Sequence, residues 1–504
     1  MNRRQMIASS AAAALSAAAA PSFASPTGAQ MPASRPTPPV ARKIPVVIEQ
    51  LGRTRTDDYQ WMKDDNWQAV LRDPSLIKAE VKEHLDAENA YREAMMVSTL
   101  PLQETMFREM RGRIKEDDAS VPAPDGPWEY YVRYNTGDQH PLYCRKPRNG
   151  GPEQVLLDAN ALAEGKAYSE VSNASHSPDH ALFAYAEDAQ GSEVHKIYVK
   201  DLATNQVLPE VIDSATGDFA FSPDSQWIFW TNRNDNGRPD KIFRRPATGG
   251  ETTLVYEEED EGMFIGVGRT SDDRFIVIGV QNQETSETRY IPGDAPTTEP
   301  LVLEPREVAH RYDADHWGDR WVIRTNGGDA VDFKIVTAAT DAPARSGWTD
   351  LVPHTPGRFI ESFDLTRDHL ARQERSDANT RIIIRDRAGA EHEIAADEPA
   401  FALSLAGASE YDTGVTRYAY NSPSTPTQTY DYDMGSRERT LRKTQEIPSG
   451  HDVANYVVER LNAPASDGEL VPVTVLRRKD TPVDGSAPLL LYGYGSYEAS
   501  MDPY

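Results

Sequence analysis

The 504-residue sequence has a single cysteine, Cys144, and a deficit of basic residues. One cysteine excludes an internal disulfide framework and a cysteine-based metal site, so Cys144 is expected to be a small buried side chain. The 53 lysines and arginines stand against 79 aspartates and glutamates, which gives a formal net charge of −26. This charge argues against nucleic acids and anionic membrane surfaces as partners and favours cationic ligands, although it also serves solubility.

Long apolar runs are also missing after the N-terminus, which argues against a transmembrane helix of about 20 residues. Residues 1–24 differ from the rest of the chain. An arginine pair at 3–4 precedes the alanine-rich stretch 6–20, and Ser22-Phe23-Ala24 has small residues where a signal peptidase cleaves. We interpret residues 1–24 as a signal peptide and expect a periplasmic protein. The arginine pair favours the twin-arginine route, with the Sec route as the alternative.

Helix-forming patterns are confined to one short part of the chain. Residues 25–45, rich in proline, alanine and serine, are predicted to be a flexible linker. Between residues 46 and 120, Asp73-Pro74 is typical of a helix start, and apolar residues then recur at every fourth position. A second helix is predicted over residues 102–113. A segment this small and charged should not fold alone, so we expect it to pack against the chain after residue 450.

From residue 121 to 447 a two-stranded unit recurs. Ser177-Pro178-Asp179 precedes an apolar run and, after a glycine-containing turn, a second run. Short apolar runs on either side of a polar turn are typical of a β-hairpin. The pattern returns at Ser222-Pro223-Asp224, and weaker copies follow and precede it. The runs lie at 129–135 and 141–145, 181–186 and 194–199, 227–231 and 241–244, 275–280, 321–325 and 332–336, 370–375 and 380–386, and 415–421 and 428–433.

Seven copies indicate a mainly β fold with a seven-bladed β-propeller. Their spacing ranges from 45 residues, between Ser177 and Ser222, to 51 residues, between Gly126 and Ser177. A period of this length with short strands and no helices is typical of propeller blades. A single four-stranded blade cannot bury both of its faces, whereas blades stacked in a ring cover one another and leave few open edges. A series of β-sandwich domains, which also has short strands and turn signals, is the alternative.

Several motifs resemble the prolyl oligopeptidase family of serine peptidases. Asp57-Asp58-Tyr59-Gln60-Trp61-Met62 is similar to the family's Asp-x-Tyr-x-Trp-Leu opening, and Glu88-Asn89-Ala90-Tyr91 matches its Glu-Asn-x-Tyr. Residues 141–145, 177–180 and 492–497 are similar to the oligopeptidase B branch, which includes protease II. The order and spacing of these motifs extend the resemblance from about residue 45 to the last residue.

The resemblance implies a seven-bladed propeller that caps an α/β-hydrolase domain, admits short peptides and excludes folded proteins. It implies that the N-terminal helices belong to the catalytic side. The implied activity is that of a serine oligopeptidase that cleaves short, basic peptides after Lys or Arg. A prolyl-cleaving peptidase is one alternative, and a propeller retained as a non-catalytic binding protein is another. The oligomeric state is left open.

Residues 448–504 are interpreted as the incomplete start of the α/β-hydrolase domain. Two strands are predicted at 456–461 and 471–477, and an apolar third strand at 488–492 should be buried on both faces. The Gly-x-Ser-x-Gly elbow of that fold does not occur in this sequence, and all 11 histidines lie at or before His451. We therefore expect this chain to lack the Ser-Asp-His triad, to be truncated within the catalytic domain and to be inactive by itself.

Two site residues follow from the resemblance. Tyr494, in Tyr492-Gly493-Tyr494-Gly495, matches the tyrosine whose hydroxyl donates to the oxyanion in this family, and the flanking glycines suit a sharp turn. Asp502 matches an acidic position that the oligopeptidase B branch links to basic substrates. Tyr504 departs from a second acid that is usual there, and Glu498 replaces the family's usual glycine.

Cofactor-binding patterns are weak in this sequence. Asp313, Asp315 and His316, and likewise Asp431 and Asp433, have the residue types of metal ligands. Alternating acids in a strand, however, more often face solvent. No glycine-rich phosphate-binding loop is present. We therefore predict neither a metal nor a cofactor.

Overall fold

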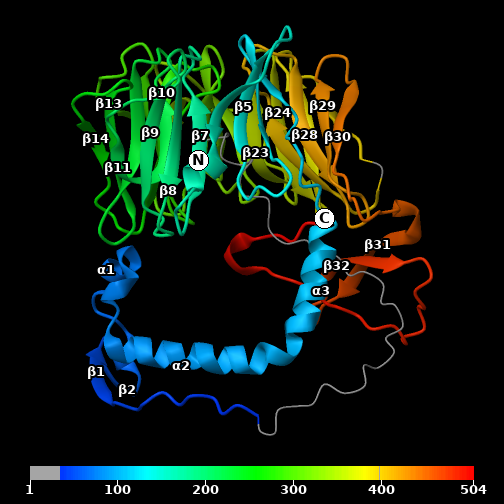
Figure 1. The fold of residues 1–504 in the computed structure, drawn as a ribbon. Coiled ribbons are helices and arrows are strands. Elements are labelled where there is room, and N and C mark those ends of the chain that lie inside the picture. The colour runs from blue at the N-terminus through cyan, green and yellow to red at the C-terminus, as the bar shows by residue number, and fades with distance from the viewer. Residues whose placement is uncertain (1–34, 397) are drawn as a thin grey trace. The chain divides into compact units, whose positions relative to one another are not determined.

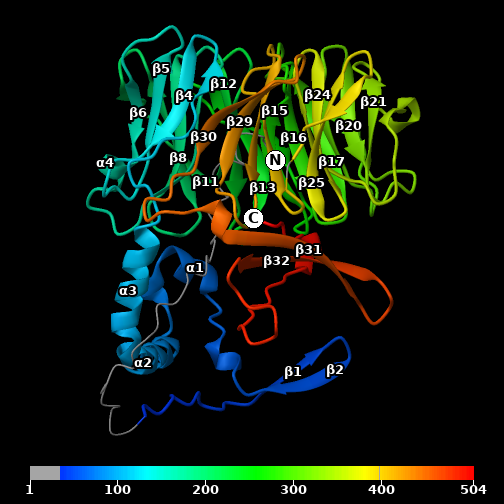
Figure 2. The ribbon, with the colours of Figure 1, turned by 90° about the vertical axis from the view of Figure 1, so that its right-hand side faces the viewer.

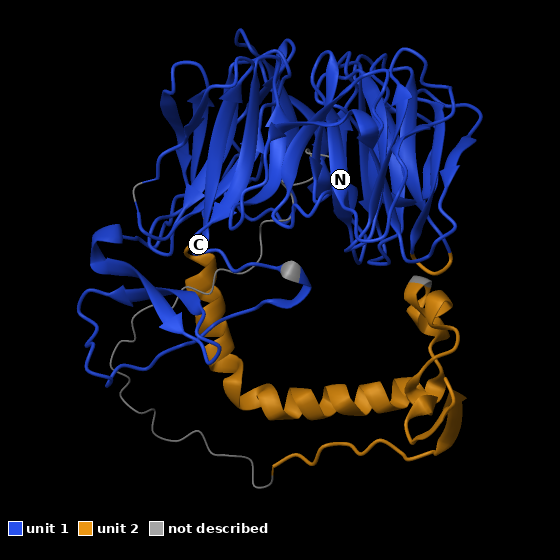
Figure 3. Ribbon diagram, turned by 180° about the vertical axis from the view of Figure 1, so that it is seen from behind, with its two compact units in different colours: residues 1–10, 115–234, 238–504 blue, residues 11–114, 235–237 orange. Residues whose placement is uncertain are grey.

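The computed structural model describes residues 35–396 and 398–504, so the predicted signal peptide lies outside the described residues. Within the described residues, 115–234 and 238–504 form one compact unit, and 35–114 with 235–237 form a second (Figure 3). The second unit contains the predicted helices, and the first contains every sheet from β3 onward.

The smaller unit starts with a β-hairpin that the sequence pattern did not predict. β1 (Val46–Gln50) pairs antiparallel with β2 (Arg53–Asp57). Leu51 and Gly52 form the two-residue turn, with φ angles of 53° and 69°. Both values lie in the left-handed region that tight hairpin turns require, because that backbone twist matches the twist of the strands. The N-terminal helical segment expected over residues 46–120 therefore begins with two strands and is helical only in its later part.

Three α-helices follow this hairpin in the smaller unit (Figure 1). They are α1 (Trp67–Arg72), α2 (Ala79–Met96) and α3 (Leu100–Arg111). α3 confirms the predicted second helix, although each end lies two residues earlier than expected. No helix within the described residues is both long and apolar enough to cross a membrane. Packing of this unit against the chain after residue 450 stays a prediction.

The predicted helix start at Asp73 is correct for one turn only. The Asp73 carboxylate accepts a hydrogen bond of 3.0 Å from the backbone N–H of Ser75, and it caps a 3₁₀ turn over Pro74–Leu76. Ile77 and Lys78 then have ψ angles of 138° and 133°, far from the helical range. The long helix α2 therefore begins at Ala79, after an interruption that the periodicity of apolar residues did not reveal.

The larger unit is built from antiparallel sheets whose strands follow one another in chain order (Figures 1 and 2). Five sheets have four strands each. The first two are β3 (Ala123–Asp125), β4 (Trp128–Arg133), β5 (Leu142–Pro147) and β6 (Gln154–Asp158), followed by the short helix α4 (Ala159–Ala163), and β15 (Phe264–Arg269), β16 (Phe275–Gln281), β17 (Ser286–Pro292) and β18 (Leu301–Glu304).

The remaining three four-stranded sheets follow in sequence. They are β19 (Tyr312–His316), β20 (Arg320–Thr325), β21 (Lys334–Ala339) and β22 (Thr349–Val352); β23 (Phe359–Leu365), β24 (His369–Ser376), β25 (Asn379–Asp386) and β26 (Glu391–Glu393); and β27 (Ala402–Gly407), β28 (Val415–Asn421), β29 (Gln428–Asp433) and β30 (Arg439–Thr444). In each of them a two-stranded hairpin occupies the middle of the sheet.

A sixth sheet has eight strands, because β11 pairs with two neighbours. Ile212 at one end of β11 lies opposite Ile197 of β9, and Phe219 at the other end lies opposite Trp230 of β12. The register shifts between these pairs. The sheet contains β7 (Glu170–His176), β8 (Leu182–Asp188), β9 (His195–Asp201), β10 (Gln206–Val207), β11 (Ile212–Phe221), β12 (Trp227–Arg233), β13 (Pro239–Pro246) and β14 (Thr253–Glu257).

The repeated hairpins are confirmed, whereas the count of seven separate blades is not. Each predicted copy forms an antiparallel pair. The hydrogen-bonded sheets of the repeat region, however, number six among the described residues, since β7–β14 form one sheet. The seven pairs are β4–β5, β8–β9, β12–β13, β16–β17, β20–β21, β24–β25 and β28–β29.

The Ser-Pro-Asp motif forms the turn into the second strand of its unit. The Ser222 hydroxyl donates to the Asp224 carboxylate at 2.5 Å and accepts from the Trp227 backbone N–H at 2.9 Å. Ser177 makes the equivalent contacts, and Thr270 takes the same place in the next sheet. A short hydroxyl or carboxylate side chain can satisfy the turn's backbone N–H groups, which explains why these residue types recur.

The first and last sheets also contact each other. The Glu410 carboxylate accepts hydrogen bonds of 2.9 Å from the Gly126 backbone N–H and from the Arg148 guanidinium. Arg417 on β28 donates to the Val121 carbonyl at 3.1 Å, just before β3. The series of sheets therefore closes on itself, as a β-propeller requires, and polar side chains rather than a shared strand make the closure.

The core lies between consecutive sheets. Phe229 and Ile242, from β12 and β13, pack with Ile276 and Ile278 of β16, and all four side chains are fully buried. Ile382 of β25 packs in the same way in a cluster with residues of β28 and β29. Because each sheet covers the face of the next, the apolar runs of the repeats are buried without a separate covering layer.

The chain after β30 contains one predicted hairpin and lacks one predicted strand. β31 (Tyr456–Pro464) and β32 (Leu470–Arg478) pair antiparallel, which confirms both expected strands. Residues 488–492 form no strand, and Leu489, Leu490 and Leu491 are 82–83% exposed. The expectation of a strand buried on both faces is therefore wrong. An apolar run becomes a buried strand only with hydrogen-bonded neighbours on its edges and covering layers on its faces, and no described strand pairs with this run.

Candidate functional site

Tyr494 lies in an irregular stretch directly before a tight turn. Its side chain is 53% exposed. Gly495 precedes a 3₁₀ turn over Ser496–Glu498, in which Tyr497 has a left-handed φ of 57°. A sharp change of chain direction thus follows Tyr494, as the flanking glycines suggested. The Tyr494 residue is therefore about half-exposed to solvent.

Asp502 is held by an arginine of the propeller. The Arg375 guanidinium binds the Asp502 carboxylate through both terminal nitrogens, with Nη2 at 3.3 Å from Oδ2. On its other side Arg375 donates from Nε to Glu361 Oε1 at 2.7 Å. The side chains of Glu361, Arg375 and Asp502 are 19%, 18% and 25% exposed. We call these three residues the Arg375 triad.

A β-bulge and a hydrogen bond fix Glu361, which is the acid on the propeller side of the Arg375 triad. Glu361 is the extra residue of a β-bulge in β23, since Ile360 pairs with Glu374 and Ser362 pairs with the next residue, Gln373. The Gln373 amide donates to Glu361 Oε2 at 2.6 Å. A bulge turns a side chain away from the regular alternation of a strand, and bulges are over-represented next to active sites.

The chain after the propeller touches the same end of this sheet at a second point. Arg460 of β31 donates to the Asn379 side chain at 2.6 Å and to the Ala378 carbonyl at 3.3 Å. Both acceptors belong to the tight turn between β24 and β25, where Asp377 and Ala378 have φ angles of 52° and 58°. Arg375 lies just before this turn, so two arginine contacts connect the sheet to the later part of the chain.

The acidic residues weighed as metal ligands are used for packing. Asp315 is 8% exposed and accepts from the Ser271 N–H at 2.7 Å, and the fully buried His316 bonds Asp272 at 2.6 Å. Burial is the largest single influence and opposes ionisation of Asp272, but its interactions with His316, Thr270 and the Arg274 N–H together lower the pKa of the carboxyl. These residues connect two neighbouring sheets. Of the four alternating acids Asp313, Asp315, Asp431 and Asp433, only Asp313 is exposed, so the expectation that such acids face solvent is wrong for the other three.

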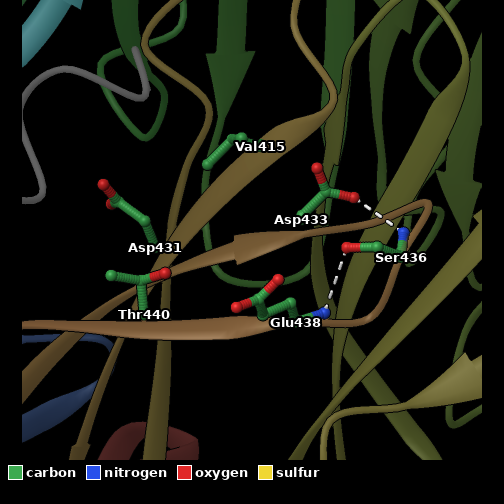
Figure 4. A pocket seen from close by; sticks show the side chains of 6 residues that line it. All are labelled: Val415, Asp431, Asp433, Ser436, Glu438 and Thr440. Atoms are coloured by element: carbon green, nitrogen blue, oxygen red, sulfur yellow. Dashed lines mark hydrogen bonds between the residues drawn. The ribbon is translucent and has the colours of Figure 1, made fainter.

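Asp431 and Asp433 line a small hollow of about 260 Å³ with Val415, Ser436, Glu438 and Thr440 (Figure 4). Asp433 accepts from the backbone N–H groups of Gly435 and Ser436 at 3.0 and 2.7 Å, as a turn-capping residue does. Asp431 pairs with Arg417 at 2.7 Å. Within the described residues no group of three metal-ligating side chains is gathered.

Cys144 is a buried packing residue, as expected. Its side chain is 1% exposed, and burial raises the pKa of the thiol to about 11. A thiol with this pKa is not ionised near neutral pH, so it is a poor nucleophile.

The closed series of antiparallel sheets defines a β-propeller protein, and sequence comparison specifies which kind. The pattern described as "Prolyl oligopeptidase, N-terminal beta-propeller domain" matches residues 38–445. The chain therefore belongs to the prolyl oligopeptidase family, as the motifs indicated. The predicted β-propeller is confirmed with it.

The similarity to relatives extends beyond the propeller. The dipeptidyl aminopeptidase BI of Pseudoxanthomonas mexicana is 39% identical over 95% of this chain and 68% of its own length. Protease 2 of Moraxella lacunata is 29% identical over 92% and 67%. The solved oligopeptidase B of Leishmania major has a TM-score of 0.85 at 30% identity, over 93% of this chain and 68% of that one. The chain thus spans about two thirds of the length of these peptidases.

Sequence reasoning missed Arg375 and Glu361. Asp502 lies 127 residues after Arg375, and no local pattern connects the two. The one available signal was that an acid and an arginine sit in the paired strands of the same repeat, a combination that occurs in other repeats of this chain without any such role.

Proposed function

We propose that this chain is the propeller-bearing part of a serine peptidase that hydrolyses short peptides after Lys or Arg. The observation that carries the proposal is membership of a family whose relatives match more than nine-tenths of this chain and are named as peptidases. The specificity is supported by Asp502, which binds a guanidinium in this structure. A carboxylate that accepts a bidentate guanidinium has the geometry needed for an arginine side chain.

In the proposed mechanism Tyr494 stabilises the oxyanion of acyl transfer. Attack on a peptide carbonyl places negative charge on its oxygen, and a preorganised donor at that oxygen lowers the barrier by about 3–4 kcal/mol. The half-exposed Tyr494 before a sharp turn is compatible with this role. The Gly-x-Ser-x-Gly elbow does not occur in this sequence, and no histidine follows residue 451. We therefore expect the 504-residue chain by itself to lack the Ser-Asp-His catalytic triad and to show no turnover.

The propeller is proposed to have seven blades and to limit the size of the substrate. Dividing the eight-stranded sheet into β7–β10 and β11–β14 adds two four-stranded units to the five separate sheets, which makes seven. Ser214 and Gly217, with φ angles of 59° and 94°, lie where β11 passes from one unit to the other. A crystal structure with a continuous β9–β11 ladder through residues 212–221 would contradict this division.

Export to the periplasm is part of the proposal. The arginine pair and the alanine-rich stretch within residues 1–24, which have the pattern of a signal peptide, support it. Fractionation of cells that express the native gene should recover the protein in the periplasm with Ser25 as its first residue. Recovery of an uncleaved protein in the cytoplasm would contradict the export proposal.

Removal of dipeptides from free N-termini is a second candidate activity. It is favoured by the relative with 39% identity, which is named a dipeptidyl aminopeptidase. The two activities differ at the substrate's N-terminus, since only an aminopeptidase requires a free amine near the cleaved bond. Cleavage after proline remains the third alternative.

One assay separates these activities. The protein produced from its native gene is incubated with an N-blocked arginyl, an N-blocked prolyl and a free dipeptidyl chromogenic substrate, with and without a serine-directed phosphonate. Hydrolysis of the blocked arginyl substrate that the phosphonate abolishes is the expected result. Hydrolysis of the free dipeptidyl substrate alone would favour the second activity. No hydrolysis of any substrate would favour a non-catalytic binding protein.

A further inference from the structure

The Arg375 triad contains two carboxylates and only one cation. Glu361 and Asp502 both bind the Arg375 guanidinium, so the three groups carry a net charge of −1. Burial alone would lower the pKa of Arg375, but its hydrogen bonds to Asp502 and the charges of both carboxylates raise it, so Arg375 stays charged. One further cation would therefore bring the net charge of the Arg375 triad to zero.

The Arg375 triad differs from an arginine pair that serves packing alone. Arg372, on the same strand, bonds Glu374 at 2.5 Å and Glu391 at 2.8 Å and is 1% exposed. Glu374 is 2% exposed, so a small cation cannot reach that contact, and the more exposed Glu391 is already bound by a second arginine, Arg385. Arg375 and Asp502, with 18% and 25% of their side chains exposed, are accessible from solvent. Ion pairs that remain partly exposed are weak, so the bond between Arg375 and Asp502 can be exchanged.

Glu361 retains Arg375 while that exchange takes place. Its bulge position and its bond from Gln373 hold the carboxylate independently of Asp502. If a second cation binds Asp502, Arg375 keeps its bond to Glu361, and two neutral pairs replace one charged triad. The exchange thus leaves no carboxylate without a partner, which avoids the main cost of breaking a partly buried ion pair.

We propose that Arg375 sets the affinity of Asp502 for cationic ligands, because it occupies this carboxylate until a cationic side chain of a peptide replaces it. This inference rests on the proposed function, in which Asp502 contacts a basic substrate. Arg375 acts as an internal competitor: a guanidinium or ammonium group can replace it at Asp502, whereas a neutral side chain cannot. Arg375 thereby weakens the binding of basic peptides to Asp502 and keeps this carboxylate paired when no basic peptide is bound.

Binding to the 504-residue chain tests the inference without requiring catalysis. The probes are N-acetyl-arginine amide and its neutral counterpart N-acetyl-norleucine amide, measured by isothermal titration calorimetry. Arg375→Met removes the competitor and leaves both carboxylates, so the arginine probe should bind at least about tenfold more tightly than to wild type. The norleucine probe should be unaffected. Arg375→Lys should give a smaller gain, because an ammonium holds Asp502 less well than a bidentate guanidinium.

Arg381→Met is the matched control. Arg381 lies on the neighbouring strand β25 and pairs with Glu393, so this variant loses the same charge and an ion pair without touching Asp502. It should leave both probes unchanged. The double variant Arg375→Met with Asp502→Asn should lose the gain. Thermal unfolding and circular dichroism establish that each variant is folded, and Arg375→Lys serves in place of Arg375→Met if the latter is not.

Two outcomes overturn the inference. One is a folded Arg375→Met variant that binds the arginine probe no better than wild type, which would leave the Arg375 triad as an attachment of the chain's end to the propeller. The other is an equal gain with Arg381→Met. Failure of the proposed function looks different: the binding gain is observed, but the native gene product does not cleave the arginyl substrate. Cleavage without a binding gain refutes only the role of Arg375.

Discussion

Apolar runs of the same kind are buried in the propeller and exposed in the chain that follows it. Ile276 and Ile278 of β16 are fully buried, whereas Leu489 and Leu490 are 83% and 82% exposed. Both runs contain branched aliphatic residues flanked by turn signals. β16 has a hydrogen-bonded strand on each side and a neighbouring sheet on its face. The run at 488–492 has neither among the described strands, so hydrophobicity indicates a strand only where partners exist.

The largest expected loss of stability, which tests this difference between buried and exposed apolar residues, is at Trp321. This side chain is fully buried and packs against Phe275, Tyr290 and His316. Trp321→Ala should lower the free energy of unfolding by about 3–5 kcal/mol, because it leaves a large cavity between two sheets. Urea denaturation of the 504-residue chain followed by circular dichroism measures this loss. Leu490→Ala is the control and should change the free energy by less than about 0.5 kcal/mol. Equal losses would break the comparison.

Tyr494 tests whether an exposed residue after the propeller matters for activity rather than for stability. In the native gene product, Tyr494→Phe should lower kcat/KM for the arginyl substrate about a hundredfold, because only the hydroxyl donor is lost. The unfolding transition should not move, since 53% of the side chain is exposed. Tyr492→Phe, in the same stretch and 75% exposed, is the control and should leave the rate unchanged. A rate unaffected by Tyr494→Phe would contradict the role of Tyr494 as the oxyanion donor.

The turns of the repeats are the next smaller effect. Ser222 is fully buried and connects the Asp224 carboxylate to the Trp227 N–H. Ser222→Ala should lower the free energy of unfolding by about 1–2 kcal/mol, because it leaves a buried N–H without its acceptor. Ser436→Ala removes a 3.4 Å contact with the Glu438 N–H and a side-chain hydrogen bond to Asp433, both in an exposed turn, and should have a much smaller effect. If the two variants unfold at the same urea concentration, the repeated turn motif does not stabilise the sheets.

The smallest expected effect depends on pH. The hydrogen bond from Arg133 lowers the pKa of Glu153 from an ordinary 4.5 to about 2, against the opposing effect of burial. A lowered pKa in the folded state means that this carboxylate stabilises the protein above about pH 4.5 and ceases to do so as the pH falls toward 2. Because solvent screens the pair, the contribution is about 1 kcal/mol or less.

Glu153→Gln tests the contribution directly. The variant should be slightly less stable than wild type at pH 7, and the difference should shrink as the pH is lowered from about 5 to about 3. Glu446→Gln, at an exposed acid that pairs with Lys115 at 2.7 Å, gives a comparison for a pair with greater exposure. Urea denaturation across a series of pH values measures both. A difference that grows on acidification would mean that the folded protein raises the pKa of Glu153 instead of lowering it.

Much of the propeller could be predicted because its signals are local. Each predicted copy contains an antiparallel pair, since alternation, turn residues and the Ser-x-Asp caps lie within a single repeat. The joining of β7–β14 into one eight-stranded sheet could not be predicted, because it depends on the pairing of β11 with both β9 and β12. The interruption before α2 was also invisible, since Ile77 fits the apolar period although its backbone is not helical.

The candidate site shows the same division between local and distant information. Tyr494 and Asp502 could be singled out from motifs that lie within a few residues. Arg375 and Glu361 could not, because their importance comes from a contact across 127 residues and from a bulge that redirects one side chain. A charged residue in a strand has many possible partners, and the sequence does not say which one it meets.

The sequence by itself determined the family, the repeated hairpins and the turns, because each depends on neighbours along the chain. Only the tertiary structure decided three other features: how the last sheet meets the first through Glu410, which cation Asp502 binds, and that the leucines at 489–491 stay exposed. Each of these depends on atoms brought together from distant positions. Burial and ion pairing depend on distances in space. The contribution of a side chain to the stability of the folded protein is therefore defined only by the residues that surround it there.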